Sequence, residues 1–137
     1  MKRSAPLART SELRSRSRLP AKSKKPGYAH QKKALDALCR QIVFKRDPKC
    51  QRCGKVENGQ WCHVSSRRYI ALRWRLENSL RLCAGCHLWW HHRPLEAVTW
   101  FKATFPQRAH KIELLSSVPQ KVDLELERLY LEAEAAK

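Results

Sequence analysis

The fold of this 137-residue chain is decided by residues 50–92, which read CQRCGKVENGQWCHVSSRRYIALRWRLENSLRLCAGCHLWWHH. This stretch contains two Cys-x-x-Cys pairs, Cys50 with Cys53 and Cys83 with Cys86. A Cys-x-x-Cys pair on a tight turn directs both sulfur atoms to one centre, and two pairs supply the four thiolates of a closed tetrahedral zinc site. The spacing therefore predicts one structural Zn²⁺ held by these four cysteines.

Two other uses of paired cysteines fit the sequence less well. A disulfide framework needs an oxidising compartment, and the chain opens MKRSAPLARTSELRSR without an apolar run that would direct it to one. A redox dithiol needs one Cys-x-x-Cys pair, and two are present. We therefore expect a cytoplasmic location. Cys39 lies outside both pairs in a predicted helix, and we expect it to be a buried, small apolar residue.

A second set of reactive side chains lies between and just after the cysteine pairs. His63 follows an apolar-leaning run, Asn78 precedes an apolar run, and His87 directly follows the second pair. The order histidine, asparagine, histidine, with the last histidine in a Cys-x-x-Cys-His, resembles the HNH nucleases of the ββα-metal (His-Me finger) class. The similarity covers the middle part of the chain.

This resemblance implies two antiparallel strands and a helix wrapped around one divalent ion. His63 would be the general base, and Asn78 would hold its imidazole through a hydrogen bond. His87 and His91 would bind the ion, Mg²⁺, Mn²⁺, Ni²⁺ or Zn²⁺, because residues four apart share one face of a helix. Phosphodiester hydrolysis needs a water that loses a proton near neutral pH, and the free pKa of histidine lies closest to that range. The ion would neutralise charge on the phosphate and the leaving oxygen.

Many members of that class place a further metal-binding aspartate or histidine just before the base, where this chain has Cys62. A thiolate there would suit a soft ion such as Zn²⁺ and is a poor partner for Mg²⁺. Cys62 is therefore a further candidate ligand, and the alternative is a buried strand residue. His92 is adjacent to His91 and faces another direction on a helix, so we expect it to contact phosphate or solvent.

The wider pattern around these residues is similar to the lambdoid-phage recombination endonucleases of the NinG and Rap type. Those proteins are associated with branched recombination intermediates. The similarity implies a role in DNA recombination or processing in a bacterial or phage-infected host cell. It rests on Cys50, Cys53, Gly54, Trp61, His63, Ala71, Arg73, Trp74, Glu77, Asn78, Cys83 and Cys86.

The charge of the chain independently indicates a polyanionic partner. The formal net charge is +17 and the isoelectric point is about 10.2. Residues 1–26 carry many cations, Lys24 and Lys25 among them, against the single acid Glu12, and we expect a disordered arm that contacts phosphates. A transit peptide shares this composition, although the prolines argue against a presequence helix. No apolar run is long enough to cross a bilayer, so DNA rather than a membrane is the expected partner.

The segment between His63 and Asn78 contains SSRRYIALRWRLE, in which arginines alternate with aromatic residues. Guanidinium groups match phosphate geometry well, so we expect this segment to hold the DNA backbone beside the scissile bond. The alternative is a solvated basic loop with aromatic anchors. The expected phosphate contacts are Arg67, Arg68, Arg73 and Arg75.

The rest of the chain predicts helices that support this central part. Apolar residues recur every three or four positions in each of them. The first helix would cover the zinc lobe with its apolar face. The last would pack back onto the core or pair with a second copy, so both a monomer and a homodimer are considered. The predicted helices span residues 28–45, 95–105, 107–115 and 120–136.

Together these patterns predict an α+β protein with a small zinc-stabilised ββα-metal core flanked by helices. The basic arm would span 1–26, the nuclease domain 27–118 and the C-terminal helix 119–137. Within the core we expect Trp89 and Trp90 to pack against helices rather than stack on bases.

The expected function is metal-dependent hydrolysis of DNA with low sequence specificity. The alternative is a non-catalytic, zinc-containing module that binds nucleic acid. That reading explains the cysteines and the charge but gives no joint role to His63, Asn78 and His87. A third interpretation is an RNA-processing nuclease.

Overall fold

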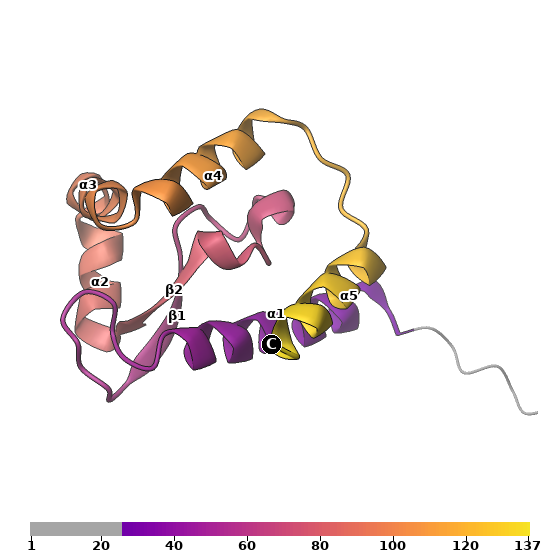
Figure 1. The fold of residues 1–137 in the computed structure, drawn as a ribbon, viewed down its shortest axis with the longest axis horizontal. Helices are drawn as coiled ribbons and strands as arrows, with labels where there is room; N and C mark the ends of the chain where they lie inside the picture. The colour runs from indigo at the N-terminus through magenta and orange to yellow at the C-terminus, as the bar shows by residue number, and fades with distance from the viewer. Residues whose placement is uncertain (1–25) are drawn as a thin grey trace, which may run out of the picture.

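A computed structural model describes residues 26–137, which form an α+β fold of helices around a two-stranded sheet (Figure 1). The expected basic arm, with Lys24 and Lys25, lies outside the described residues except for Pro26. The elements are α1 Tyr28–Arg46, β1 Gly59–His63, the 3₁₀ turns η1 Ile70–Leu72 and η2 Leu76–Asn78, β2 Ser79–Cys83, α2 Ala84–His92, α3 Pro94–Thr104, α4 Pro106–Ser117 and α5 Leu124–Ala135.

The chain between the cysteine pairs folds as an antiparallel hairpin that runs directly into a helix. In this hairpin Gly59 of β1 pairs with Cys83 of β2, and His63 pairs with Ser79. Helix α2 begins at Ala84, the residue after β2, so strand and helix are joined without a loop. The expected order of two antiparallel strands and a helix is therefore present.

One apolar core lies between the sheet and helices α2, α3 and α4. Trp90 and Phe101 are buried in it, and their rings meet edge to face with centroids 6.2 Å apart. Trp89 and Trp90 also meet Trp100 of α3 edge to face. Such aromatic pairs stabilise packing beyond the area they bury. The two tryptophans of α2 therefore act as packing residues, as the sequence predicted.

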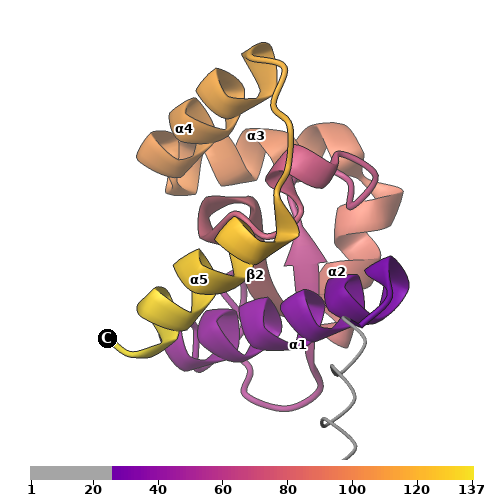
Figure 2. The same cartoon turned by 90° about the vertical axis from the view of Figure 1, so that its right-hand side faces the viewer.

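A second core lies between α1 and α5, which run side by side in both views (Figures 1 and 2). Leu35 and Val43 of α1 pack there with Trp74 and with Leu131 of α5. Three of the four paired cysteines, Cys50, Cys83 and Cys86, belong to the other core. The prediction that the first helix covers the zinc lobe is therefore wrong, because the period of apolar residues tells which face is buried but not what it meets.

The last helix packs back onto α1, which was one of the two predicted arrangements. It begins at Leu124 rather than at residue 120, because the Asp123 carboxylate accepts hydrogen bonds from the amides of Glu125 and Leu126 at 2.8 and 3.3 Å. An aspartate at this position satisfies amides that have no partner within the helix. No helix in the described part of the chain combines the length and apolarity needed to cross a membrane.

Cys39 is fully buried in α1, and its thiol donates a hydrogen bond to the carbonyl oxygen of Trp74 at 3.7 Å. Burial raises the pKa of this thiol to about 12. A neutral, buried thiol of this kind behaves as a small apolar side chain. The prediction for Cys39 is confirmed.

Candidate metal centre and histidine cavity

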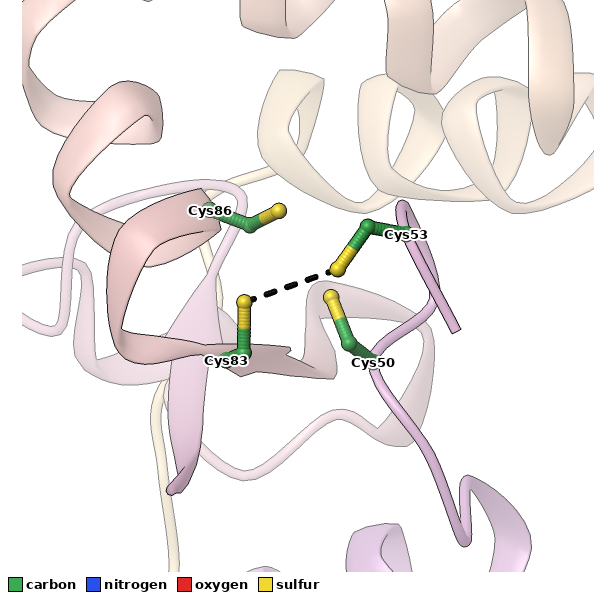
Figure 3. Close-up of side chains that lie close together, drawn as sticks. All are labelled: Cys50, Cys53, Cys83 and Cys86. Carbon is green, nitrogen blue, oxygen red and sulfur yellow. Dashed lines mark hydrogen bonds between the residues drawn. The ribbon is translucent and has the colours of Figure 1, made fainter. Parts of the chain in front are cut away.

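The four paired cysteines converge from three places in the chain (Figure 3). Cys50 and Cys53 lie in the turn after α1, Cys83 ends β2, and Cys86 lies in the first turn of α2. Their sulfur atoms all lie within 4.8 Å of one another, and those of Cys53 and Cys83 are 3.6 Å apart. Four sulfur atoms this close together could hold one structural metal ion such as zinc.

The turn that carries the first pair needs a glycine. Gly54 has a φ of +77°, in the left-handed region that glycine adopts without steric cost. Its amide donates to the Cys50 carbonyl at 2.9 Å, and the Cys50 amide donates to the Lys55 carbonyl at 2.8 Å. These two bonds close the turn and bring both sulfur atoms to one side of it.

Two of the four thiols, those of Cys50 and Cys86, have pKa values shifted in opposite directions. Burial alone would raise the pKa of Cys50, but hydrogen bonds from the backbone amides of Cys53, Cys83 and Arg52 lower it to about 6. Burial and the neighbouring thiols raise the pKa of Cys86 to about 12. Adjacent thiolates repel one another, whereas a divalent ion among them stabilises all four as thiolates.

A separate cavity of about 530 Å³ joins the first strand, the following loop and helix α2. The proposed base and the proposed ion ligands open onto this one space, together with two basic side chains of the loop. The residues that line it are Trp61, His63, Val64, Ser66, Arg67, Arg68, His87, Trp90 and His91.

His63 ends β1, and its ring is fixed from one side. Its Nε2 lies 3.1 Å from the carbonyl oxygen of Arg73, so Nε2 carries the proton and Nδ1 is left as an acceptor. Burial, with a smaller contribution from the positive charge of Arg67, lowers the pKa of His63 to about 4, although the bond to Arg73 opposes the shift. The imidazole is therefore neutral near pH 7, as a general base must be.

Asn78 is fully buried, but it does not hold the His63 imidazole as predicted. Its side-chain oxygen accepts from the Ser65 amide at 2.7 Å. Its NH₂ group donates to the carbonyls of Ser65 and Leu72 at 3.1 and 3.0 Å. Asn78 thus fixes the backbone of the loop that follows β1, and the backbone of Arg73 takes over the contact to the imidazole. The residue order in the sequence does not specify which acceptor an amide finds.

His87 and His91 face each other on α2, as their spacing predicts. Their Nε2 atoms are 3.1 Å apart, and the ring centroids are 4.7 Å apart. The Nδ1 of His87 hydrogen-bonds the side-chain oxygen of Gln60. Burial and the positive charges of His91 and Arg67 lower the pKa of His87. When both rings are unprotonated, two imidazoles arranged in this way could hold one cation between their Nε2 atoms.

Gln60 is a site residue that sequence reasoning missed. It orients His87 from the neighbouring strand, and a hydrogen bond of this kind to the second ring nitrogen commonly fixes a metal-binding histidine. The only signal that could find it is the register of β1 on β2, which brings Gln60 opposite Leu82 near the start of α2.

Two of the four arginines predicted to contact phosphate form ion pairs with carboxylates inside the protein. Arg73 donates to both oxygens of Asp36, at 2.9 and 2.5 Å, and Arg75 donates to Glu127 at 2.7 Å. Each of these cations already has a buried or half-buried partner, which leaves less of its charge for a phosphate. Their assignment as phosphate contacts stays a prediction.

Arg67 and Arg68 differ from these two arginines. Both are exposed, both line the histidine cavity, and within residues 26–137 neither forms an ion pair with a carboxylate. Their charges are available to a phosphate bound in the cavity.

Cys62 is a buried strand residue rather than a metal ligand. Successive side chains of a strand point to opposite faces, so Cys62 and His63 point away from each other. Cys62 is fully buried in the core, and burial raises the pKa of its thiol to about 12. Of the two interpretations of Cys62, the structure therefore favours a buried strand residue over a metal ligand. His92 is exposed at the end of α2 and does not line the cavity.

In comparisons with known proteins, no family model, curated protein or solved structure matches the chain.

Proposed function

We propose that this chain is a metal-dependent endonuclease of the HNH type that hydrolyses DNA phosphodiester bonds with low sequence specificity. One observation carries the proposal. His63, neutral and with an acceptor nitrogen, lines the same cavity as the facing pair His87 and His91 and as Arg67 and Arg68, which have no carboxylate partner among residues 26–137.

His63 has the properties required to deprotonate an attacking water. Its Nε2 proton is held by the Arg73 carbonyl, so the base is Nδ1. Because its pKa is lowered, the imidazole is neutral at pH 7 and can accept a proton. A positioned base contributes about 10²- to 10⁴-fold to such a reaction. Arg67 and Arg68 bind the phosphate that the water attacks, because guanidinium groups pair with phosphate oxygens.

The ligands for a catalytic ion are His87 and His91, with Gln60 orienting the first of them. When bound there, a divalent ion supplies a Lewis acid that neutralises charge on the phosphate and the leaving oxygen. Among Mg²⁺, Mn²⁺, Ni²⁺ and Zn²⁺, two imidazole donors favour Ni²⁺ and Zn²⁺ over the oxygen-seeking Mg²⁺.

The positions of the unpaired cations favour DNA as the partner. Exposed Lys33, Arg40 and Lys45 of α1 form no ion pair in the described residues, like the cavity arginines. In α3 and α5, by contrast, Lys102 and Arg128 are paired with glutamates. Phosphate binding through unpaired cations gives affinity with little sequence preference.

A plasmid-nicking assay with added divalent ions tests the proposal. We expect the wild type to nick supercoiled plasmid and His63→Ala to lose about 10²-fold or more of that activity. His110→Ala is the matched control, because His110 is exposed on α4 and lies outside the cavity. Undiminished nicking by His63→Ala would remove the catalytic assignment. DNA binding without cleavage under every ion would favour the non-catalytic module instead.

The substrate is then defined by comparing linear duplex, single-stranded DNA, RNA and a four-way junction at equal concentration. The resemblance to phage recombination endonucleases favours the junction. Preferential cleavage of RNA would contradict the proposed DNA substrate.

A further inference from the structure

Asp36 is the one acidic residue in the sequence of α1, and its carboxylate accepts three hydrogen bonds from two neighbouring residues. Arg73 donates from Nε at 2.9 Å and from Nη2 at 2.5 Å, and the Trp74 indole donates from Nε1 at 2.8 Å. Burial would raise the pKa of Asp36, but the bonds from Arg73 and Trp74 hold it below its ordinary value. Asp36 is therefore a carboxylate with a fixed orientation.

The peptide bond between Arg73 and Trp74 is the one that holds the proposed base. Its carbonyl oxygen lies 3.1 Å from the Nε2 of His63. The side chains on both sides of this peptide are tied to Asp36. Helix α1 makes one more hydrogen bond to this segment, from the Cys39 thiol to the Trp74 carbonyl.

We infer that Asp36 is a positioning residue for His63, acting through the Arg73–Trp74 peptide whose carbonyl accepts the hydrogen bond from the imidazole N–H. This inference rests on the proposed function and deepens it. The carboxylate fixes the carbonyl, and the carbonyl selects the tautomer with the proton on Nε2 and the lone pair on Nδ1. Without Asp36 the carbonyl is free to move, and the imidazole loses the partner that sets its tautomer and its orientation.

A neighbouring ion pair provides a control that distinguishes positioning of His63 from general stabilisation of the loop. Arg75 donates to Glu127 of α5 at 2.7 Å, so it also ties the same loop to a helix through a carboxylate. Neither residue touches His63 or the Arg73 carbonyl in the described structure. Glu127→Gln is therefore a matched control for Asp36→Asn, because each change removes one loop-to-helix ion pair.

The test combines ¹⁵N NMR of the histidine side chains with cleavage kinetics on the full chain loaded with metal. In the wild type and in Glu127→Gln, we expect His63 to be protonated on Nε2 alone. In Asp36→Asn, we expect a mixture of tautomers and a kcat at least about 10-fold lower, with KM for DNA within about twofold, since small misplacements of a catalytic group cost this much. Kinetics alone would not distinguish positioning from general destabilisation, whereas the tautomer does.

A wild-type tautomer and a kcat equal to that of Glu127→Gln would overturn the inference. If Asp36→Asn does not fold, Trp74→Phe removes the indole donor together with part of a buried ring. It is expected to shift the tautomer in the same direction, and an unshifted tautomer there also overturns the inference. If the wild type cleaves no nucleic acid, the proposed function fails, and the NMR comparison still decides whether Asp36 positions His63.

Discussion

The cysteine centre and the histidine cavity are both anchored on α2, yet they are built in different ways. Cys86 and His87 are consecutive residues, but the first faces a closed cluster of sulfur atoms and the second faces an open cavity. Three of the four cysteines, Cys50, Cys83 and Cys86, are buried and Cys53 is exposed, whereas His91 is exposed and His87 is half-buried. Structural metal sites are closed and catalytic sites keep an accessible position. One short helix therefore presents a site suited to stability and a site suited to reaction.

The largest effect is expected where the cysteine centre is broken. Cys83→Ser removes a ligand at the junction of β2 and α2, and metal binding supplies on the order of 10 kcal/mol of folding free energy in small four-ligand domains. We expect loss of bound zinc and of cooperative thermal unfolding, measured by metal analysis and circular dichroism. Cys62→Ala is the control, because it removes a buried thiol outside the centre. Retention of full zinc by Cys83→Ser would contradict the assignment.

A smaller effect is expected in the histidine cavity, where Gln60 orients His87. Loss of such an outer contact commonly costs about 10- to 100-fold in metal affinity. We therefore expect Gln60→Ala to weaken Ni²⁺ or Zn²⁺ binding at the cavity by this factor and to leave the cysteine-bound zinc in place. Isothermal titration of the zinc-loaded protein measures it, with Gln107→Ala on the surface of α4 as control. Equal affinities for the two variants would show that Gln60 does not orient a ligand.

The two sites also differ in how far the sequence predicted them. The sequence predicts all four cysteines of the centre, because the two members of each Cys-x-x-Cys pair are brought together locally. The first pair lies in the turn closed around Gly54, and the second lies at the start of α2. The histidines were predicted, but their partners were not. The Arg73 carbonyl, Gln60 and Asp36 come from strand register and from helix packing, which residue spacing does not encode.

The arginines illustrate the same limit. Arg67, Arg68, Arg73 and Arg75 are equivalent by composition, and only the fold separates two exposed cations from two that are paired with α1 and α5. A lone acid in a basic helix, Asp36, was the available signal for one of those pairs.

Substitutions of the exposed arginines and of the paired arginines are therefore expected to have different effects. Each phosphate contact contributes about 0.9 to the slope of log affinity against log salt concentration. We expect the double variant Arg67→Ala with Arg68→Ala to lower that slope by about 2 for duplex DNA and to leave the melting temperature unchanged. Arg73→Ala is expected to lower the melting temperature with little change in slope, because its guanidinium is held by Asp36. The reverse pattern would contradict the division.

A further effect is expected on stability as a function of pH. Burial lowers the pKa of His63 to about 4 from an ordinary value of 6.5, and nearby Arg67 and Arg73 lower it while Asp36 raises it. The fold thus favours the neutral ring, so its contribution is fully present above pH 6.5 and is lost as the pH falls towards 4. Urea unfolding at several pH values should show the wild type losing stability relative to His63→Gln across this window. Parallel profiles would mean that His63 is not buried in its neutral form.

The central claim is that the cysteine centre stabilises the fold while the histidine cavity binds a second ion and cuts DNA. Its most direct test is plasmid nicking by protein that carries one zinc per chain, before and after a second divalent ion is added. We predict no nicking with one zinc, nicking after Ni²⁺, Mn²⁺ or Zn²⁺ is added, and none at any ion concentration for the double variant His87→Ala with His91→Ala. Nicking by the one-zinc protein before a second ion is added would contradict the claim, and so would nicking by that double variant at the wild-type rate after the ion is added.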